Sequence, residues 1–306
     1  GVIYSAPARG RISPAGGQNG TAMPRAGKPS MVQFSHRSLY FPALFLPTAS
    51  LALDPPDSAC RCPRLVHQVA GFQMAEDSSI DQERHDMPSE NERIALTMLS
   101  GSFEYDSEDS LTVLRGYLKE NAPAVDATLI AYQSEDDNPS LELLEEETDV
   151  LLVFTRRLNT DGAELERFKS YCDRGGAVVG IRTASHAYQN WLPFDGEVLG
   201  GNYDGHYGSG MTALVEIAEG AREHPILTEV LPFESHGSLY RNTPISASAS
   251  LLLTGRTEEH FEPVAWTRTD GSGRVFYTSL GHQKDFWELD FLRLIENAVL
   301  WAASKA

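Results

Sequence analysis

Between residues 93 and 191, short apolar runs alternate with segments of helical spacing, and this alternation constrains the fold more than any other feature. Four runs have the form of buried strands: "RIALTMLSG", "DATLIAY", "DVLLVFTRR" and "GGAVVGI". The third run is almost continuously apolar, which is typical of parallel strands that are covered on both faces. Strands separated by helices favour a doubly wound, mostly parallel sheet between two helical layers, an α/β fold of three layers.

The segments between and after these runs carry helix and turn signals. "NTDGAELERFKSYCDRGG" is the clearest helix, with Asn159 or Thr160 as the expected cap, Cys172 on the apolar stripe and two glycines at the end. "SEDSLTVLRGYLKENAP" predicts a second helix, and the chain closes with the amphipathic "DFLRLIENAVLWAASK". Further strands are predicted in "MTALVEIAE", "SASLLLTGR", "PVAWTRT" and "RVFYTSLG", with a "DGSG" turn before the last.

The first 90 residues have a different composition from the remainder. They are rich in Pro, Gly, Ser, Ala and Arg without periodicity, which predicts a disordered leader or sequence upstream of the true start. Residues 91–306 are predicted to form one α/β domain. Cys60 and Cys62 form a lone C-x-C and indicate neither a zinc framework nor a disulfide scaffold.

The chain contains no run of 18 apolar residues, so no transmembrane helix is predicted. A cytoplasmic location is expected. The alternative is export: if translation begins at Met31, the apolar segment 38–53 would be the hydrophobic region of a signal peptide.

The formal net charge of −18 arises almost entirely after residue 86. An acidic domain repels phosphate groups, which argues against nucleic acid and anionic membrane surfaces as partners. A small-molecule ligand fits this charge, and a homo-oligomer is left open.

Ligands of open α/β sheets bind at the carboxyl ends of the parallel strands. Several polar residues follow predicted strands there: Glu104 and Tyr105 after the first strand, Arg182 and His186 after the fourth, and His282 after the last. Two further segments, "GGNYDGHYGSG" and "FESHGSLYRN", are expected to be loops, and they supply polar and aromatic residues at His206, Tyr203, Asp204, Tyr207, His236 and Tyr240. Histidine suits proton transfer or metal binding near neutral pH, although a single loop histidine is more often a surface or structural residue.

The stretch "VVGIRTASHAYQNW" resembles the nucleophile turn G-I-C-x-G-x-Q of class I glutamine amidotransferases. Arg182 stands at the cysteine position. Since arginine cannot act as a thiolate, the amidotransferase reaction is excluded there. His186 is expected to start the helix that follows.

Seven motifs in order resemble the trehalose-utilisation (ThuA-like) family between residues 93 and 304: "LVFTRR", "GGAVVGIRTASHAYQNW", "GGNYDGHYGSG", "EHPI", "SHGSLYRN", "PVAWTR" and "GRVFYTSLGHQKDF". The resemblance implies the glutamine amidotransferase-like, flavodoxin-related fold and a role in carbohydrate metabolism, with action on oxidised (keto) sugars. It maps the family's typical positions onto Arg182, His186, His206, His236, Tyr240 and His282. Many members also carry a histidine after the first strand. Here "SGSFEYDS" has none, so a metal site that needs this ligand is not implied.

We therefore expect an enzyme that acts on a disaccharide or keto sugar by acid/base chemistry. His186 or His282 would be the base, His206 or His236 the acid, and Arg182 the electrophile beside a carbonyl oxygen. The residues expected to bind the substrate are Tyr240, Tyr203, Asp204, Tyr207 and Glu104. Two alternatives are kept. One is a metal-dependent hydrolase that holds a divalent metal through histidines with Asp204 or Glu234, although the sequence has no H-x-H or H-x-x-x-H pair. The other is a non-catalytic sugar-binding or regulatory module. No other cofactor is predicted.

Overall fold

The computed structural model describes residues 93–208, 210–269 and 273–304. The predicted leader, the Cys60–Cys62 pair and the apolar segment 38–53 lie outside these ranges, as does most of the "DGSG" turn. Within them, no helix has both the length and the hydropathy needed to span a membrane.

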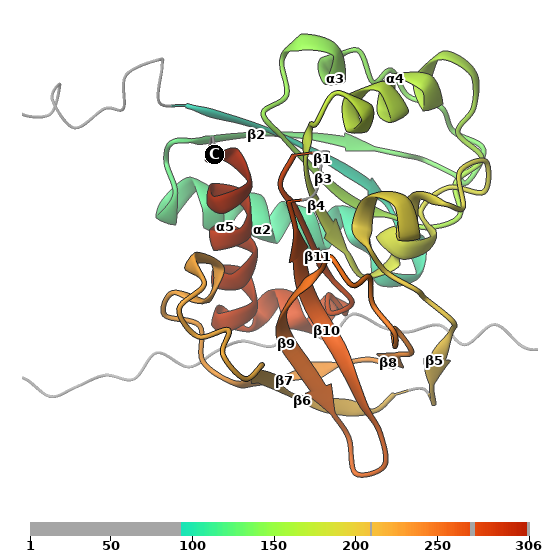
Figure 1. Cartoon of the computed structure of the whole chain (residues 1–306). Helices are drawn as coiled ribbons and strands as arrows, with labels where there is room; N and C mark the ends of the chain where they lie inside the picture. Colours follow the sequence, from blue (N-terminus) through green and yellow to red (C-terminus); the bar gives the residue numbers. More distant parts are fainter. Residues whose placement is uncertain (1–92, 209, 270–272, 305–306) are drawn as a thin grey trace, which may run out of the picture. The chain divides into compact units, whose positions relative to one another are not determined.

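A nine-stranded sheet forms the centre of the fold (Figure 1). Its first part is parallel, in the order β2 (Val125–Ala131), β1 (Ile94–Gly101), β3 (Val150–Thr155), β4 (Ala177–Ile181) and β11 (Val275–Thr278). An antiparallel extension follows, in the order β10 (Phe261–Arg268), β9 (Ser250–Arg256), β6 (Thr212–Ile217) and β7 (Phe233–His236). The predicted α/β fold is confirmed, and the hairpin partners β10 and β11 are the point at which strand direction changes.

Helices cover both faces of the parallel part, and the side chains of β3 show why. Leu152 and Phe154 belong to one apolar cluster, whereas Leu151 and Val153 belong to the other, because alternate residues of a strand face opposite sides. The first cluster is covered by α2 (Ser107–Asn121) and α5 (Leu289–Ala303), and the second by α3 (Leu143–Glu146) and α4 (Gly162–Asp173) (Figure 1).

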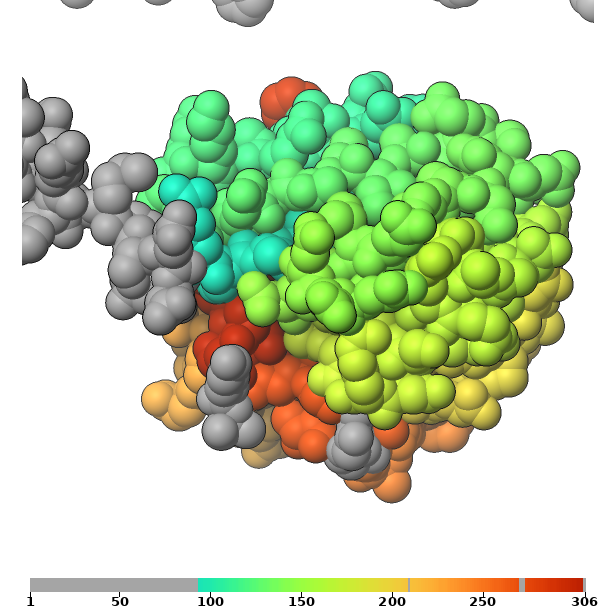
Figure 2. Space-filling model, turned by 90° about the horizontal axis from the view of Figure 1, so that it is seen from above, coloured from blue at the N-terminus to red at the C-terminus, as the bar shows by residue number. Residues whose placement is uncertain are grey.

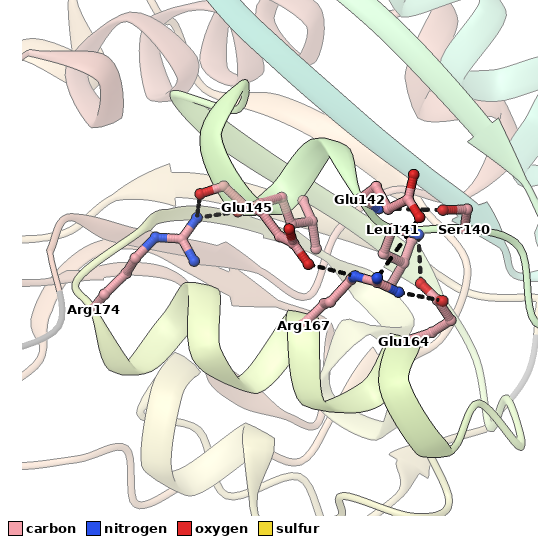
Figure 3. Close-up of polar contacts among 8 residues, drawn as sticks. Ser140, Leu141, Glu142, Glu145, Glu164, Arg167 and Arg174 are labelled. Atoms are coloured by element: carbon pink, nitrogen blue, oxygen red, sulfur yellow. Dashed lines mark hydrogen bonds and ion pairs between the residues drawn. The ribbon is translucent and has the colours of Figure 1, made fainter.

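Polar contacts fix the short helix α3 onto α4 (Figure 3). The Arg167 guanidinium donates to Glu145 and Glu164 at 2.6 Å each, and Glu164 also accepts the backbone N–H of Leu141 at 2.7 Å. Arg174 donates to the backbone carbonyl oxygens of Leu144 and Glu145. Single surface ion pairs stabilise little, but a guanidinium shared by several acceptors sets the orientation of the two helices.

The predicted cap of α4 is wrong by one or two residues. Asp161 occupies the N-cap position. Asn159 is engaged elsewhere, since its side chain donates to Asp136 at 2.6 Å and its backbone N–H donates to Glu135 at 2.7 Å. Cys172 is buried as expected, and burial raises the pKa of its thiol to about 12.

The edge at which the parallel strands begin is closed by the end of α5. Figure 2 shows the red C-terminal atoms at the surface beside yellow-green residues of the middle of the chain. Arg274 donates to the carbonyl oxygen of Trp301 at 2.8 Å, and Gly175, Gly176 and Ala302 line a cavity of about 670 Å³ there. This cavity lies at the opposite edge from the predicted site residues, which follow the strands.

Candidate functional site

The turn after β4 places Arg182 at the centre of the site. Arg182 has a φ of 46°, a left-handed conformation that costs a non-glycine residue about 1 kcal/mol or more. The Tyr277 hydroxyl holds this turn by donating to the Arg182 carbonyl oxygen at 2.7 Å. The predicted helix starting at His186 is wrong, because the structure has only the 3₁₀ turn η3 (Arg182–His186). Beyond this turn, the Ala187 carbonyl oxygen accepts the Leu158 N–H at 2.8 Å, and the Gln189 N–H donates to the Leu158 carbonyl oxygen at 2.9 Å. These bonds prevent the turn from continuing as a helix.

The Arg182 side chain is buried between two tyrosines, with only 1% of its surface exposed. Its guanidinium carbon lies 4.5 Å from the Tyr105 ring centre and 4.7 Å from that of Tyr240. Its nitrogens donate to the carbonyl oxygens of Ser279 (2.9 Å) and Ser238 (3.3 Å) and to the Tyr105 hydroxyl (3.2 Å). We call these three residues, Tyr105, Arg182 and Tyr240, the Tyr–Arg–Tyr stack. The stack holds the positive charge of Arg182 in a fixed, buried position.

Two predicted histidines lie on the Tyr240 side of this stack. The His186 ring is 6.2 Å from Tyr240 and stacks on Tyr203 at 4.5 Å, and Tyr203 in turn lies 4.6 Å from Tyr240. His206 lies 6.4 Å from the Tyr240 ring, because the short strands β5 (His206–Tyr207) and β8 (Leu239–Tyr240) pair these two residues. His206 and Tyr240 were both expected in loops and are instead in strands.

The environment of His186 keeps it neutral. Burial, followed by the charges of Arg156, Arg157 and Arg182, lowers the pKa of His186 to about 3. Its Nδ1 is 3.0 Å from the Ser185 hydroxyl. A neutral imidazole of such low basicity is suited to hydrogen bonding rather than to accepting a proton.

The other two histidines lie on the Tyr105 side. The His282 ring is 6.1 Å from Tyr105, and the His236 ring is 6.2 Å from His282. His236 ends β7, a strand that its sequence does not reveal, and His282 follows β11 and caps η6 (Gln283–Trp287) by accepting the Lys284 N–H at 3.2 Å. Burial lowers the pKa of His282. All four histidines therefore surround one buried arginine.

Asp285 is the main residue of the site that the sequence does not predict. It is fully buried, and its Oδ2 accepts hydrogen bonds from the Ser235 hydroxyl (2.7 Å) and from the backbone N–H groups of Gly281 and His282 (3.0 Å each). Its Oδ1 accepts the His236 N–H at 2.8 Å and lies 3.5 Å from His236 Nδ1. The available signal was its place three residues after a cap in "HQKD", the spacing of a capping box. Tyr105 follows β1 as part of η2 (Phe103–Tyr105), the place after the first strand where polar residues are expected at the ligand edge.

Three of the predicted substrate-binding residues have other contacts. Glu104 pairs with Arg156 at 3.1 Å, near His186. Asp204 is exposed, with its carboxylate 3.7 Å from Arg241. Tyr207 donates to Glu262 at 3.0 Å and stacks on His260 at 3.7 Å, so only Tyr203 and Tyr240 of this set lie on the stack.

The donor set does not fit a metal ion. Over the described ranges, no three His, Cys, Asp or Glu side chains are grouped so as to hold one. The carboxylate between His236 and His282 is that of Asp285, whose oxygens already accept four hydrogen bonds.

A comparison with known families agrees with this architecture. The model of the ThuA family, described as "Trehalose utilisation", matches residues 95–302. The chain belongs to the ThuA family. The predicted family is confirmed, and membership supports a carbohydrate-related role.

Solved structures of ThuA-like proteins show the same fold. A putative ThuA-like protein from Parabacteroides merdae is 19% identical, with 69% of this chain and 90% of that chain covered and a TM-score of 0.56. One from Bacteroides uniformis is 20% identical, with 70% and 92% covered and a TM-score of 0.55. No curated protein matches this ThuA-family chain significantly.

Proposed function

We propose that this ThuA-family protein catalyses proton transfer on an oxidised (keto) sugar, a disaccharide or a derivative of one. The observation that supports the proposal is the gathering of four histidines and three tyrosines around the buried charge of Arg182. Aromatic faces pack against sugar rings, and neutral imidazoles and hydroxyls hydrogen-bond to sugar oxygens.

In this proposal His236 and His282 exchange protons with the substrate. One of them removes the proton from the carbon beside the ketone, and the electron pair moves into the carbonyl to give an enolate. The other returns a proton, either to carbon in an isomerisation or to the departing oxygen in an elimination. His186 serves as a hydrogen-bonding group because it is too weakly basic to act as the base, and in this proposal His206, beside Tyr240, has the same role.

Arg182 acts through its neighbours. Its side chain is 1% exposed and its terminal nitrogens are hydrogen-bonded, so it stabilises developing negative charge by its field and by polarising the Tyr105 hydroxyl to which it donates. This differs from the sequence expectation of direct contact with the carbonyl oxygen.

Proton exchange with solvent tests the proposal directly. The purified chain is incubated in D₂O with a 3-keto disaccharide and, separately, with the unoxidised parent sugar, and products are analysed by mass spectrometry. We expect deuterium incorporation or a new product from the keto sugar alone. Absence of both for a panel of keto disaccharides would rule the proposal out.

Variants then test the assignment. His236→Asn and His282→Asn are each expected to slow exchange by about 100-fold or more, the usual contribution of a general acid or base. The matched control is His224→Asn, because His224 caps η5 (Pro225–Leu227) and Asn can still accept that hydrogen bond. If both site variants keep the wild-type rate, the base lies elsewhere.

A non-catalytic sugar-binding module is the second candidate, and the turn after β4 favours it. Arg182 occupies the position at which the related amidotransferase turn carries its nucleophile, and its terminal nitrogens are already engaged. This candidate predicts stabilisation by about 2.7 kcal/mol at a sugar concentration 100 times the Kd, without product.

A further inference from the structure

We infer that Asp285 is a positioning residue that orients both proposed acid/base histidines and holds the proton of neutral His236 on Nδ1, leaving Nε2 as the acceptor. The inference rests on the proposed function for its catalytic meaning. Its structural part, the tautomer of His236, can be measured independently of any turnover.

The carboxylate of Asp285 joins two segments that are far apart in sequence. On one side it accepts the Ser235 hydroxyl and the His236 N–H, from the end of β7. On the other it accepts the N–H groups of Gly281 and His282, from the loop after β11. These four hydrogen bonds fix the backbone of both histidines relative to one another.

A capping role accounts for only part of this arrangement. In a capping box, the acidic residue bonds the backbone N–H of the cap residue, which here is His282. The bonds from Ser235 and His236 cross 50 and 49 residues of sequence and serve no cap. They place a fully buried carboxylate next to the imidazole of His236.

The charge of Asp285 faces the His236 ring directly. Its Oδ1 lies 3.5 Å from His236 Nδ1, a separation that shortens in many enzymes when substrate binds. An ionised carboxylate is acceptor-only, so the neutral imidazole lowers its energy by presenting Nδ1–H to it. The cationic groups that act on Asp285 and on the neighbouring His282 are Arg182 and Lys284.

The Asp285→Asn variant reverses this preference. If the amide oxygen replaces Oδ2 and keeps its three donors, the amide nitrogen replaces Oδ1, points N–H groups at the His236 ring and leaves the His236 backbone N–H without its acceptor. Nδ1 must then be the acceptor and the proton moves to Nε2. This predicts a reversed tautomer with the same side-chain shape.

The test is a long-range ¹H–¹⁵N spectrum of the histidine rings in the full chain, at a pH high enough for neutral imidazole. His236 signals are identified by their loss in His236→Asn. We expect Nδ1–H in the wild type and Nε2–H in Asp285→Asn, together with at least a 10-fold lower kcat on the keto sugar. An Nε2–H tautomer in the wild type would overturn the inference, even if the variant fails to fold.

Glu262→Gln is the matched control. Glu262 is a second buried carboxylate, and it accepts from the backbone N–H groups of Asn242 and Thr243 and from the Thr243 hydroxyl, away from His236. This substitution perturbs stability in a comparable way, and we expect it to leave the His236 tautomer unchanged. Equal changes in both variants would show that Asp285 acts only through general stability. If the tautomer behaves as expected while no keto sugar reacts, the proposed function fails and the positioning of His236 stands.

Discussion

The ring of His186 lies flat on the ring of Tyr203, with the centroids 4.5 Å apart and the planes inclined by 17°. This contact covers an imidazole that is also surrounded by three arginines, whose charges oppose protonation. His186 is thus held as a neutral hydrogen-bonding group at the edge of the Tyr–Arg–Tyr stack.

Replacing Tyr203 by Leu should raise the pKa of His186. Burial is the largest cause of its low value, and loss of the stacked ring admits water to one face of the imidazole. We expect the pKa of His186 to rise by about 1 or more, as measured by NMR titration of the ring. Tyr207→Leu is the control, because Tyr207 stacks on His260 instead. An unchanged titration in Tyr203→Leu would contradict the role of the stack.

Replacing Asp195 by Asn should change how stability depends on pH. Burial raises the pKa of Asp195 from 3.8 to about 6, and one of its oxygens accepts the Tyr203 N–H at 2.8 Å. Because the pKa of Asp195 is higher in the folded than in the unfolded protein, its favourable contribution to the free energy of unfolding is present below pH 4 and is lost as the pH rises through 6. Relative to wild type, the variant should therefore gain up to about 3 kcal/mol between pH 4 and pH 7. Urea unfolding across this range measures the difference, with Asp126→Asn, at an exposed carboxylate of β2, as the control.

Replacing Gly237 by Ala should disturb the stack and destabilise the fold. Gly237 has a φ of 91°, and an added Cβ would lie 2.9 Å from Arg182 Nη2 and 3.2 Å from His282 Cδ2. Gly220 has a φ of 79° but no atom within 4 Å of an added Cβ, so Gly220→Ala isolates the backbone cost of about 1 kcal/mol. We expect Gly237→Ala to cost about 1–3 kcal/mol more than this control in chemical unfolding. Equal losses would mean that the Arg182 and His282 side chains move aside without cost.

The order of elements was predictable because each buried strand is a short apolar run with turn residues at its ends. The family motifs also located the residues that meet at Arg182. His206, His236 and Tyr240 were expected in loops because strands of two to four residues carry too few positions for a periodic signal. Neighbouring residues of such strands face opposite ways, which separates Tyr207 from His206.

The contacts that organise the site depend on tertiary structure and leave little trace in sequence. The chain leaves the helical turn at Tyr188 because Tyr188 forms a β-bridge with Leu158, which lies far earlier in the sequence. In the sequence, Asp285 looks like an ordinary surface acid of a short helix. In the fold, β7 lies beside it and supplies two of its hydrogen-bond donors. The buried carboxylate of Asp285 is therefore stabilised by hydrogen-bond donors that no local sequence pattern identifies.

Replacing Arg182 by Lys should destabilise the protein although the charge is kept. The planar guanidinium donates to two carbonyl oxygens and one hydroxyl while packing on two tyrosine rings, and a lysine ammonium cannot reproduce this geometry. At a side chain that is 1% exposed, we expect a loss of about 2–4 kcal/mol in urea unfolding, with altered near-UV circular dichroism from Tyr105 and Tyr240. The matched change is Arg241→Lys, because Arg241 packs on the single ring of Tyr207 at 5.9 Å and is 45% exposed. That variant should lose less than about 1 kcal/mol. Similar losses for the two variants would show that the stack contributes no more than a surface contact.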